Sequence, residues 1–450
     1  MDLIRRAARR SLLSLRSKPA PVPRAGRVLP QDERVDEEIC PFYNFMDYYP
    51  AKPGEILADR YQLVVKIGWG TRSTVWLARD IRRYKWQVER FAALKINELN
   101  SEEAQYERDI EDHIAKKDPL HPGYPMIRTC IESFEITRPE GSHICLAYEP
   151  MREPFWLYQR HFRDDKLPFP VVKAYFLMLL AGLDYLHSEC RVIHTDLRLE
   201  NILVGFENQA VIEDFVKAQI DDPMEYKINA SGQTVYRRHN YFGPLRKLEN
   251  LPKIIDFGSS CRIDNPKSVG MLPIQPDHYR APEVILGRGW TFSTDIWNLG
   301  VLMWDILENT QLFQQAHDTT GHYDAKAHLA EMIALLGPPP KTLLEKADAM
   351  LRVEWPDAIQ GEGGKLCRNA QQLFGGPFFS GEGKFLYPDL IPARQLKDTL
   401  PSLEKKDREE LLSFVKKMLT WLPEERKTAR ELMEDPFLTR SSKLEKAWDK

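Results

Sequence analysis

The hydrophobic and polar positions of this 450-residue chain follow strand-like spacing first and helical spacing later. Between residues 61 and 96 the runs YQLVVKIGWG, STVWLARD and FAALKI are short, rich in β-branched and aromatic residues, and separated by turns, which indicates three antiparallel strands. Residues 100–117 then show a polar-faced helical pattern, and either Asn100 or Ser101 is suited to cap it. Two further strands are expected in MIRTCIESFEI and SHICLAYEP.

From about residue 170 the apolar positions recur with mostly helical spacing, broken by Pro- and Gly-rich loops. The most apolar run, residues 174–187, is shorter than a bilayer span and contains Asp184, so it predicts a buried core helix. A β-rich part of about 100 residues followed by a helical part predicts an α+β, two-lobed architecture.

Composition adds little to this picture, because the chain is 43% hydrophobic and 29% charged, with a net charge of −3. Such a balance gives no general attraction to nucleic acid or to anionic membranes, and we expect neither as a direct partner. The six cysteines are scattered without a CxxC pair, which favours reduced intracellular thiols over a disulfide framework or a zinc site.

The first 30 residues differ from the rest, because they are Arg-rich, interleaved with Leu, nearly free of acids, and then Pro-rich. This composition favours a disordered basic arm, and it leaves a mitochondrial transit peptide open as the alternative. Asp2 counts slightly against a targeting leader. The expected location is the cytoplasm and nucleus, with the mitochondrion as the alternative if this segment is a transit peptide.

A first group of residues with candidate chemistry crosses the three predicted N-terminal strands. Gly68 and Gly70 lie in the first hairpin, where residues without bulk let backbone N–H groups approach phosphate oxygens. Lys95, on the third strand, supplies a fixed cation suited to the α- and β-phosphates of a nucleotide. Glu107, Glu102, Glu103 and Glu111 on the following helix are candidate carboxylates to orient that lysine, and the resemblance of ERDI at 107–110 to the corresponding helix of protein kinases favours Glu107.

A second group lies in the stretch VIHTDLRLENIL at residues 192–203, where Asp196 and Asn201 stand between two apolar runs. This stretch resembles the catalytic loop of protein kinases, H-R-D-L-x-x-x-N, in which the Asp is the base and the Asn a metal ligand. Thr195 replaces the usual Arg, so this position has no guanidinium group that could bind a phosphorylated residue of the activation loop. Arg198 replaces the usual Lys near the γ-phosphate, so the charge is kept but the geometry changes.

Two similar phrases, VIEDFVKA at 211–218 and KIIDFGSS at 253–260, compete for the metal-binding aspartate of such a site. Asp214 has the usual short distance from Asn201, but a Val follows its Phe where the turn favours Gly for backbone freedom. Asp256 is followed by Phe and Gly and lies 27 residues before Glu283 of Ala-Pro-Glu. We therefore expect Asp256 to bind magnesium and residues 205–252 to form an insertion.

Two further motifs, together with Arg426, are expected to act through the architecture of the C-terminal part. The Ala-Pro-Glu motif ends at Glu283, which is expected to pair with Arg426. Asp295 begins the stretch DIWNLG, which predicts a buried helix whose carboxylate braces the catalytic loop.

Taken with these motifs, residues 57–440 resemble a eukaryotic protein kinase, and within that class the SR-protein kinase family of the CMGC group, in its fungal-type form. The resemblance rests on His194-Thr195-Asp196, on IQPDHYRAPE at 274–283, on GWGTRSTVWLARD at 68–80, and on the break before Asp256. It implies serine/threonine phosphorylation with ATP and Mg²⁺, activity without activation-loop phosphorylation, and Arg-Ser-rich substrates of the splicing type. The roles it implies for ATP binding fall on Ile67, Gly68, Trp69, Gly70, Ser73, Val75, Ala93, Lys95, Tyr148 as gatekeeper, Glu149 and Met151.

The residues that would bind an Arg-rich substrate depart from the family's pattern. In the family, carboxylates flank a His-containing helix and form a groove for Arg-rich substrates, but this chain has Ala327 and Ala334 there. The acids Asp221, Asp222 and Glu225 in the insertion are candidates to compensate. Arg-Ser specificity is thus an expectation that the resemblance carries and these two alanines weaken.

The expected boundaries are an arm at 1–30, a linker at 31–56, lobes at 57–150 and 151–440, a second insertion at 310–400, and a tail at 441–450. A monomer is expected. The main alternative is a pseudokinase that acts as a scaffold or nucleotide-binding module, favoured by Ser73, Thr195, Arg198, Ala327 and Ala334. A small-molecule kinase is less favoured, because the Ala-Pro-Glu segment and the C-terminal insertion are present.

Overall fold

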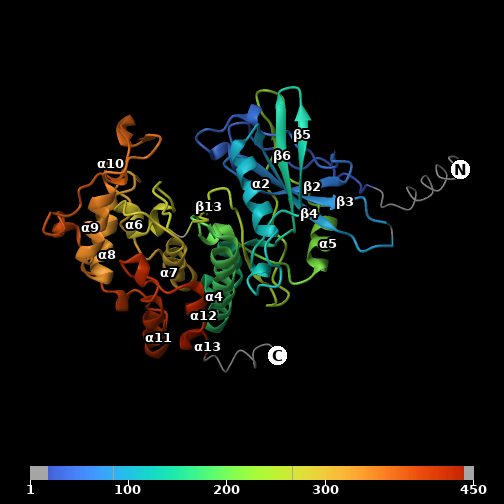
Figure 1. Ribbon diagram of the computed structural model, residues 1–450. Coiled ribbons are helices and arrows are strands. Elements are labelled where there is room, and N and C mark those ends of the chain that lie inside the picture. The colour runs from blue at the N-terminus through green and yellow to red at the C-terminus, as the bar shows by residue number, and fades with distance from the viewer. Residues whose placement is uncertain (1–18, 85, 266, 440–450) are drawn as a thin grey trace. The chain divides into compact units, whose positions relative to one another are not determined.

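The computed structural model describes residues 19–84, 86–265 and 267–439, which form two compact units (Figure 1). The sheet unit takes in Met1–Ala115, Arg128–Glu153 and Val204–Leu251, and the helical unit takes in Lys116–Ile127, Pro154–Leu203 and Pro252–Lys450. The predicted targeting leader falls mainly on residues 1–18 and the predicted tail on 441–450, which lie outside the described residues.

The sheet unit is built on an antiparallel sheet with the order β1-β2-β3-β4-β6-β5, counted over the described residues. Helix α2, Glu102–Ala115, lies against β6 (Figure 1). It begins after Ser101, whose Oγ accepts a hydrogen bond of 3.1 Å from the Ala104 backbone N–H, so Ser101 rather than Asn100 caps it. The strands are β1 Ile56–Leu57, β2 Tyr61–Gly70, β3 Ser73–Asp80, β4 Phe91–Leu99, β5 Glu132–Arg138 and β6 Gly141–Tyr148.

The predicted insertion belongs to the sheet unit, which corrects its expected place in the C-terminal lobe. Its helix α5, Gln209–Ala218, buries Val211, Ile212 and Phe215 in the same apolar core as β2, β3 and β4. It continues as a hairpin of β10, Tyr226–Ile228, and β11, Thr234–Tyr236. The segment changes unit because its apolar helix face needs a partner that the sheet supplies.

Residues 20–29, expected as the end of a disordered arm, pack on the sheet unit instead. The Gln62 side chain exchanges hydrogen bonds of 2.7 and 2.9 Å with the backbone of Ala20. Leu29 is buried, and its N–H donates to the Tyr226 carbonyl at 2.8 Å. The composition of the arm did not show this, because the apolar partners are supplied by the insertion some 200 residues later.

The helical unit contains α4, Phe169–Asp184, which continues into a π-helical turn at Tyr185–Cys190, and α7, Ser293–Glu308, which is buried along nearly its whole length. The continuous helix Phe169–Cys190 is 22 residues long and apolar enough to cross a membrane, which corrects the shorter length expected from the sequence. Most of its apolar window is buried inside the protein, at 61%, as in the core helix of a soluble fold.

Other helices surround these two, and short strands support the loops between them (Figure 1). The paired short strands are β8 Val192–Ile193 with β13 Cys261–Arg262, β14 Ile359–Gln360 with β15 Leu366–Cys367, and β9 Ile202–Val204 between β7 Glu153–Pro154 and β12 Pro252–Ile254. The helices are α3 Phe155–Tyr158, α6 Pro282–Ile285, α8 Ala325–Leu336, α9 Lys341–Met350, α10 Ala370–Phe374, α11 Lys405–Val415, α12 Ala429–Met433 and α13 Pro436–Thr439.

Candidate active site

The sheet unit carries a lysine–carboxylate pair on adjacent elements. Lys95, in the middle of β4, places its Nζ 2.7 and 2.8 Å from the two carboxylate oxygens of Glu107 on α2. Glu107 is buried, so its charge holds the ammonium group where water screens the attraction weakly. Of the three rivals, Glu103 pairs with Arg72 at 2.9 Å, Glu102 is exposed, and Glu111 faces other partners.

The glycine-rich hairpin between β2 and β3 turns at residues 71–72, with Gly68 opposite Val75 and Gly70 opposite Ser73. A Cβ built on Gly68 would come no closer than 3.6 Å to Val75, which is an ordinary contact. Packing within the protein therefore does not demand glycine at this position. Close approach of a ligand to the backbone is the remaining use for a residue without a side chain, which fits a phosphate-covering loop.

An apolar wall lies next to this hairpin on the same sheet. Ala93 and Tyr148 are directly opposite each other on β4 and β6, and Ile67 and Val75 pack against the same buried cluster. Flat apolar surface of this kind suits the face of a purine base. Glu149, which is exposed, and Met151, which is buried, follow Tyr148 along the chain.

Behind Tyr148 lies a polar network that sequence reasoning did not identify. The Tyr148 hydroxyl donates to Glu111 at 3.1 Å, and the Cys130 N–H donates to the same carboxylate at 2.7 Å. The Arg128 guanidinium lies 4.4 Å from the centre of the Tyr148 ring. Burial, together with the nearby Glu107 charge, raises the pKa of Glu111 to about 8. The only sequence signal was the spacing of Glu111, one helical turn after Glu107.

The helical unit holds the second group of residues. The Asn201 side-chain N–H₂ donates to the Asp196 carboxylate at 2.8 Å and to the Asp196 carbonyl at 2.9 Å, which leaves the Asn201 amide oxygen for another ligand. Arg198 Nε lies 3.3 Å from the same carboxylate. Burial raises the pKa of Asp196, and the charges of Arg198 and His194 oppose that rise.

The loop that carries Asp196 is braced from within the unit. Asp295, at the start of α7, accepts the backbone N–H groups of His194 at 2.8 Å and Thr195 at 3.0 Å, and His187 Nε2 at 2.8 Å. Burial alone would raise the pKa of Asp295, but these hydrogen bonds and the two histidines outweigh it and lower the pKa overall. The carboxylate therefore stays ionised and fixes the loop backbone.

The two Asp-Phe phrases have different surroundings. Asp256 follows β12 with a φ of 67°, Phe257 is fully buried beside His194, and the Asp256 charge is near enough to Asp196 to raise the pKa of Asp196. Asp214 instead lies within α5, is 54% exposed, and pairs with Arg246 at 2.8 Å. The structure thus gathers Asp196, Asn201 and Asp256 in one unit and places Asp214 on the outside of the other.

Gln275 is a second residue that the sequence reasoning missed. It has a φ of 72°, and its side chain accepts the Ala281 N–H at 2.8 Å and donates to the Thr294 carbonyl at 3.1 Å and to Asn298. Arg280 in turn donates to the Gln275 carbonyl at 3.0 Å. At the other end of the segment, the Thr195 hydroxyl donates to the Ser259 carbonyl at 2.7 Å. Uncharged side chains, those of Thr195 and Gln275, therefore contribute to holding residues 256–283 near both ends.

Comparison with known proteins places these two groups of residues in a family. The protein kinase domain family matches residues 61–244 and 245–438. A serine/threonine protein kinase of Aspergillus fumigatus is 34% identical over 416 residues, covering 91% of this chain and 92% of that protein. The serine/threonine-protein kinase SRPK of Physarum polycephalum is 29% identical over 426 residues, covering 90% and 91%.

Two further similarities cover other ranges. SRSF protein kinase 3 of Sus scrofa is 36% identical over 191 residues, which is 41% of this chain and 32% of that protein. A crystallised kinase domain superposes with a TM-score of 0.60 at 22% identity, covering 88% of this chain and all of that domain, and it shows the fold alone.

The fold and the matched residues together define a protein kinase, with a strand-rich unit and a helical unit. The chain belongs to the protein kinase family. More narrowly, it is a serine/threonine protein kinase of the SRPK type, which confirms the predicted family, fold class and enzyme class.

Proposed function

We propose that the chain transfers the γ-phosphate of ATP to Ser or Thr hydroxyls, with Lys95, Glu107, Asp196, Asn201 and Asp256 in the roles expected from the sequence. The hydrogen bond between Asn201 and the Asp196 carboxylate supports this most directly, because it fixes one oxygen of the proposed base. Asp196 would accept the proton of the substrate hydroxyl, helped by a pKa that burial raises. The proposal rests on a carboxylate that can accept a proton, on oxygen atoms that can bind a metal ion, and on an ammonium group that can bind phosphate.

The oxygen atoms of Asn201 and Asp256 fit Mg²⁺, which prefers carboxylate and carbonyl oxygen and is usually held by few protein ligands together with phosphates. In the sheet unit, Lys95 would hold the α- and β-phosphates while Glu107 fixes the ammonium group. ATP with magnesium supplies the activated phosphoryl group when bound. Transfer of labelled phosphate from ATP to a peptide, with and without EDTA, tests the proposal, and nucleotide binding without transfer would favour the scaffold alternative.

We propose in addition that activity does not require phosphorylation of the activation segment. Thr195 offers no guanidinium to a phosphate group, while Gln275 makes the buried contacts that hold the segment near the Ala-Pro-Glu motif. The uncharged Gln275 side chain thus holds the segment in a way that does not depend on an added phosphate group.

Phosphatase treatment is therefore expected to leave kcat within about twofold. Ser268→Ala, which removes an exposed hydroxyl from the segment, is expected to have as little effect. Gln275→Ala should lower kcat by about tenfold, because it leaves the buried Ala281 N–H without its acceptor and the Asn298 amide oxygen without its donor. Steady-state kinetics with mass spectrometry of the treated protein measures this, and a large loss after dephosphorylation would contradict it.

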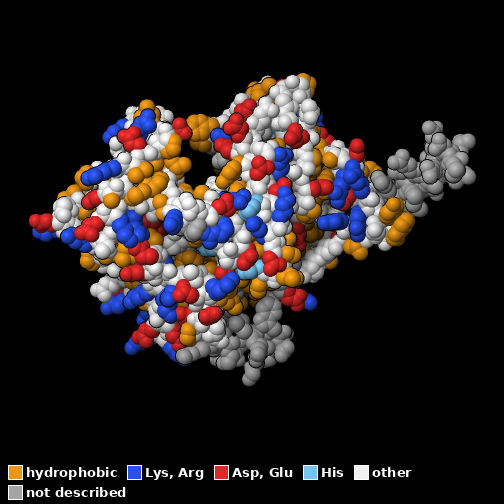
Figure 2. Space-filling model, in the orientation of Figure 1, with side chains coloured by type: hydrophobic (Ala, Val, Ile, Leu, Met, Phe, Trp, Pro, Cys, Tyr) orange, Lys and Arg blue, Asp and Glu red, His pale blue; other side chains and the backbone are white. Residues whose placement is uncertain are grey.

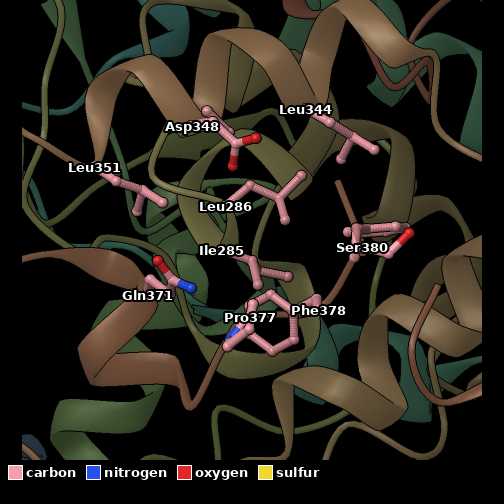
Figure 3. A pocket seen from close by; sticks show the side chains of 11 residues that line it. Ile285, Leu286, Leu344, Asp348, Leu351, Gln371, Pro377, Phe378 and Ser380 are labelled. Atoms are coloured by element: carbon pink, nitrogen blue, oxygen red, sulfur yellow. The ribbon is translucent and has the colours of Figure 1, made fainter. Parts of the chain in front are cut away.

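We propose substrates that contain Arg-Ser dipeptides, because relatives of this chain are named SRPK and SRSF protein kinase 3. Electrostatic docking on α8 contributes little, since Ala327 and Ala334 carry no charge and Glu331 is buried and paired with Arg394. A cavity beside α6 and α9 (Figure 3) also offers little charge for docking an Arg-rich peptide. It is lined mainly by apolar side chains, with Asp348 as its one carboxylate among the described residues.

Of the three candidate acids in the insertion, Asp221 and Asp222 are exposed, whereas Glu225 is already paired. Glu225 is engaged by Arg237 at 2.6 Å and by Arg27 at 2.5 Å. On the face shown in Figure 2, acidic side chains of the described residues lie among basic ones rather than in one acidic patch. Substrate choice would then depend on contacts next to the phosphorylated residue more than on a long acidic groove.

The KM for an Arg-Ser repeat peptide is therefore expected to change less than about twofold between 50 and 200 mM salt. Ala334→Glu should lower that KM by about two- to fivefold and make it salt-dependent, because it adds a half-exposed carboxylate. Ala334→Gln, of similar size and uncharged, is the control. A strong salt dependence in the unaltered protein would show that other carboxylates dock the peptide.

A further inference from the structure

A tyrosine outside the nucleotide-binding motifs contacts the tip of the glycine-rich hairpin. Tyr48 is buried, and its hydroxyl donates a hydrogen bond to the carbonyl of Thr71, the first residue of the turn between β2 and β3. Burial raises the pKa of Tyr48, so the hydroxyl stays protonated and remains a donor. A residue 20 or more positions before the hairpin thus fixes a backbone atom at its tip.

The segment that carries Tyr48 is itself held in place. The ring of Tyr43 packs against the ring of Tyr48, with 5.0 Å between the ring centres. Upstream of Tyr48, Asp36 and Glu37 pair with Lys66 of β2, which is 1% exposed, and the Asp36–Lys66 distance is 3.1 Å. The Lys66 Nζ also donates to the Tyr236 carbonyl at 2.9 Å. A buried ammonium group with two carboxylates is costly to separate, so this ion pair anchors the segment on the strand that leads into the hairpin.

The insertion supplies the other side of this anchor. Lys227 of β10 pairs with Glu38 at 2.7 Å and donates to the Glu33 carbonyl at 2.6 Å, and the Arg238 N–H donates to Asp36 at 2.6 Å. The hairpin β10–β11 therefore holds residues 33–38 against the sheet. This gives residues 205–251 a structural task, which is to hold the chain that positions Tyr48.

The opposite side of the tip has a second, weaker support. Arg72 pairs with Glu98 of β4 at 2.8 Å and with Glu103 of α2 at 2.9 Å, but its side chain is largely exposed. Exposed pairs of this kind contribute little. The buried Tyr48 hydroxyl is therefore the stronger constraint on the position of the turn.

We propose that Tyr48 is a positioning residue for nucleotide binding, which orders the tip of the glycine-rich hairpin before ATP arrives. A loop that must become ordered around phosphate loses conformational entropy on binding, and an external tether reduces that loss. Only two glycines, Gly68 and Gly70, remain in this hairpin, with Ser73 as the third position. This inference rests on the proposed ATP-binding role of the same hairpin.

Tyr48→Phe tests the inference in the full chain, because it removes one hydroxyl and keeps the ring. The KM for ATP and the dissociation constant for an ATP analogue are expected to rise by about two- to tenfold, the range for loss of one uncharged hydrogen bond, with kcat and the peptide KM within about twofold. Amide hydrogen exchange of residues 68–73 is expected to become faster. A merely structural role would lower the thermal midpoint and leave the ratio of KM to kcat unchanged.

Tyr49→Phe is the matched control, because its hydroxyl donates to Glu55 rather than to the hairpin. Unchanged ATP affinity and exchange in Tyr48→Phe, or an equal effect in Tyr49→Phe, would overturn the positioning role. Failure of the unaltered protein to bind any nucleotide would instead overturn the proposed function, so the two failures are distinguishable.

Discussion

Asp256→Ala is expected to abolish phosphate transfer, lowering kcat by at least about 10³-fold, while Asp214→Ala leaves kcat within about twofold. Asp256 lies beside Asp196 in the helical unit, where loss of its carboxylate removes a proposed magnesium ligand at the developing charge. Asp214 makes only a partly exposed ion pair with Arg246, which is worth less than about 1 kcal/mol. Transfer of labelled phosphate from ATP to an Arg-Ser peptide measures both variants.

The two aspartates control for each other, because each follows a short apolar run and precedes a phenylalanine. Thermal unfolding of both variants shows whether a lost activity reflects a lost fold. Full activity in Asp256→Ala would contradict the proposed role of Asp256 as a metal ligand. A large loss in a folded Asp214→Ala would mean that the insertion takes part in catalysis.

Arg426→Ala is expected to lower the free energy of unfolding of the helical unit by about 3–5 kcal/mol. Its guanidinium makes two hydrogen bonds of 2.5 and 2.6 Å to the Glu283 carboxylate, and both side chains have no exposed surface. Removing the arginine leaves a buried carboxylate without its counter-charge, and the cost of that charge dominates over the lost pair itself. Urea unfolding followed by circular dichroism measures the change.

Arg430→Ala is the control for this prediction, because Arg430 also pairs with a carboxylate, Asp184 at 3.0 Å, but is 60% exposed. That variant is expected to lose much less stability than Arg426→Ala, because solvent screens an exposed pair. Equal losses in the two variants would show that burial does not set the strength of the Glu283–Arg426 pair. Glu283→Gln combined with Arg426→Ala should recover part of the loss, since no unpaired charge then remains.

The candidate site was predictable where its residues follow one another closely in sequence. His194, Asp196 and Asn201 lie within one loop, and Gly258 directly after Phe257 favoured Asp256 over Asp214 without any knowledge of the fold. The fold class followed in the same way, because strand periods and helical periods occupy separate parts of the chain. Local chemistry and local spacing are enough for decisions of this kind.

The choice between Glu107 and Glu111 shows where sequence reasoning ended. The two carboxylates are one helical turn apart and share a face of α2, so spacing cannot separate them. The strands that pack against α2 separate them, because β4 presents Lys95 to Glu107 while β6 presents the Tyr148 hydroxyl to Glu111. The positions of the insertion, of Gln275 and of Tyr48 could not be predicted either, because their partners lie on other elements of the chain.

The sequence by itself determined the kinase family and the two-lobed fold class, and it supplied the candidate catalytic-loop residues, because each depends on motifs whose members are adjacent or regularly spaced. Only the tertiary structure decided which carboxylate meets Lys95, that residues 205–251 pack on the sheet unit, and that Tyr48 holds the turn at Thr71. Those contacts join residues far apart in the chain, and their free energy comes from burial and from hydrogen bonds that exist only once the chain has folded.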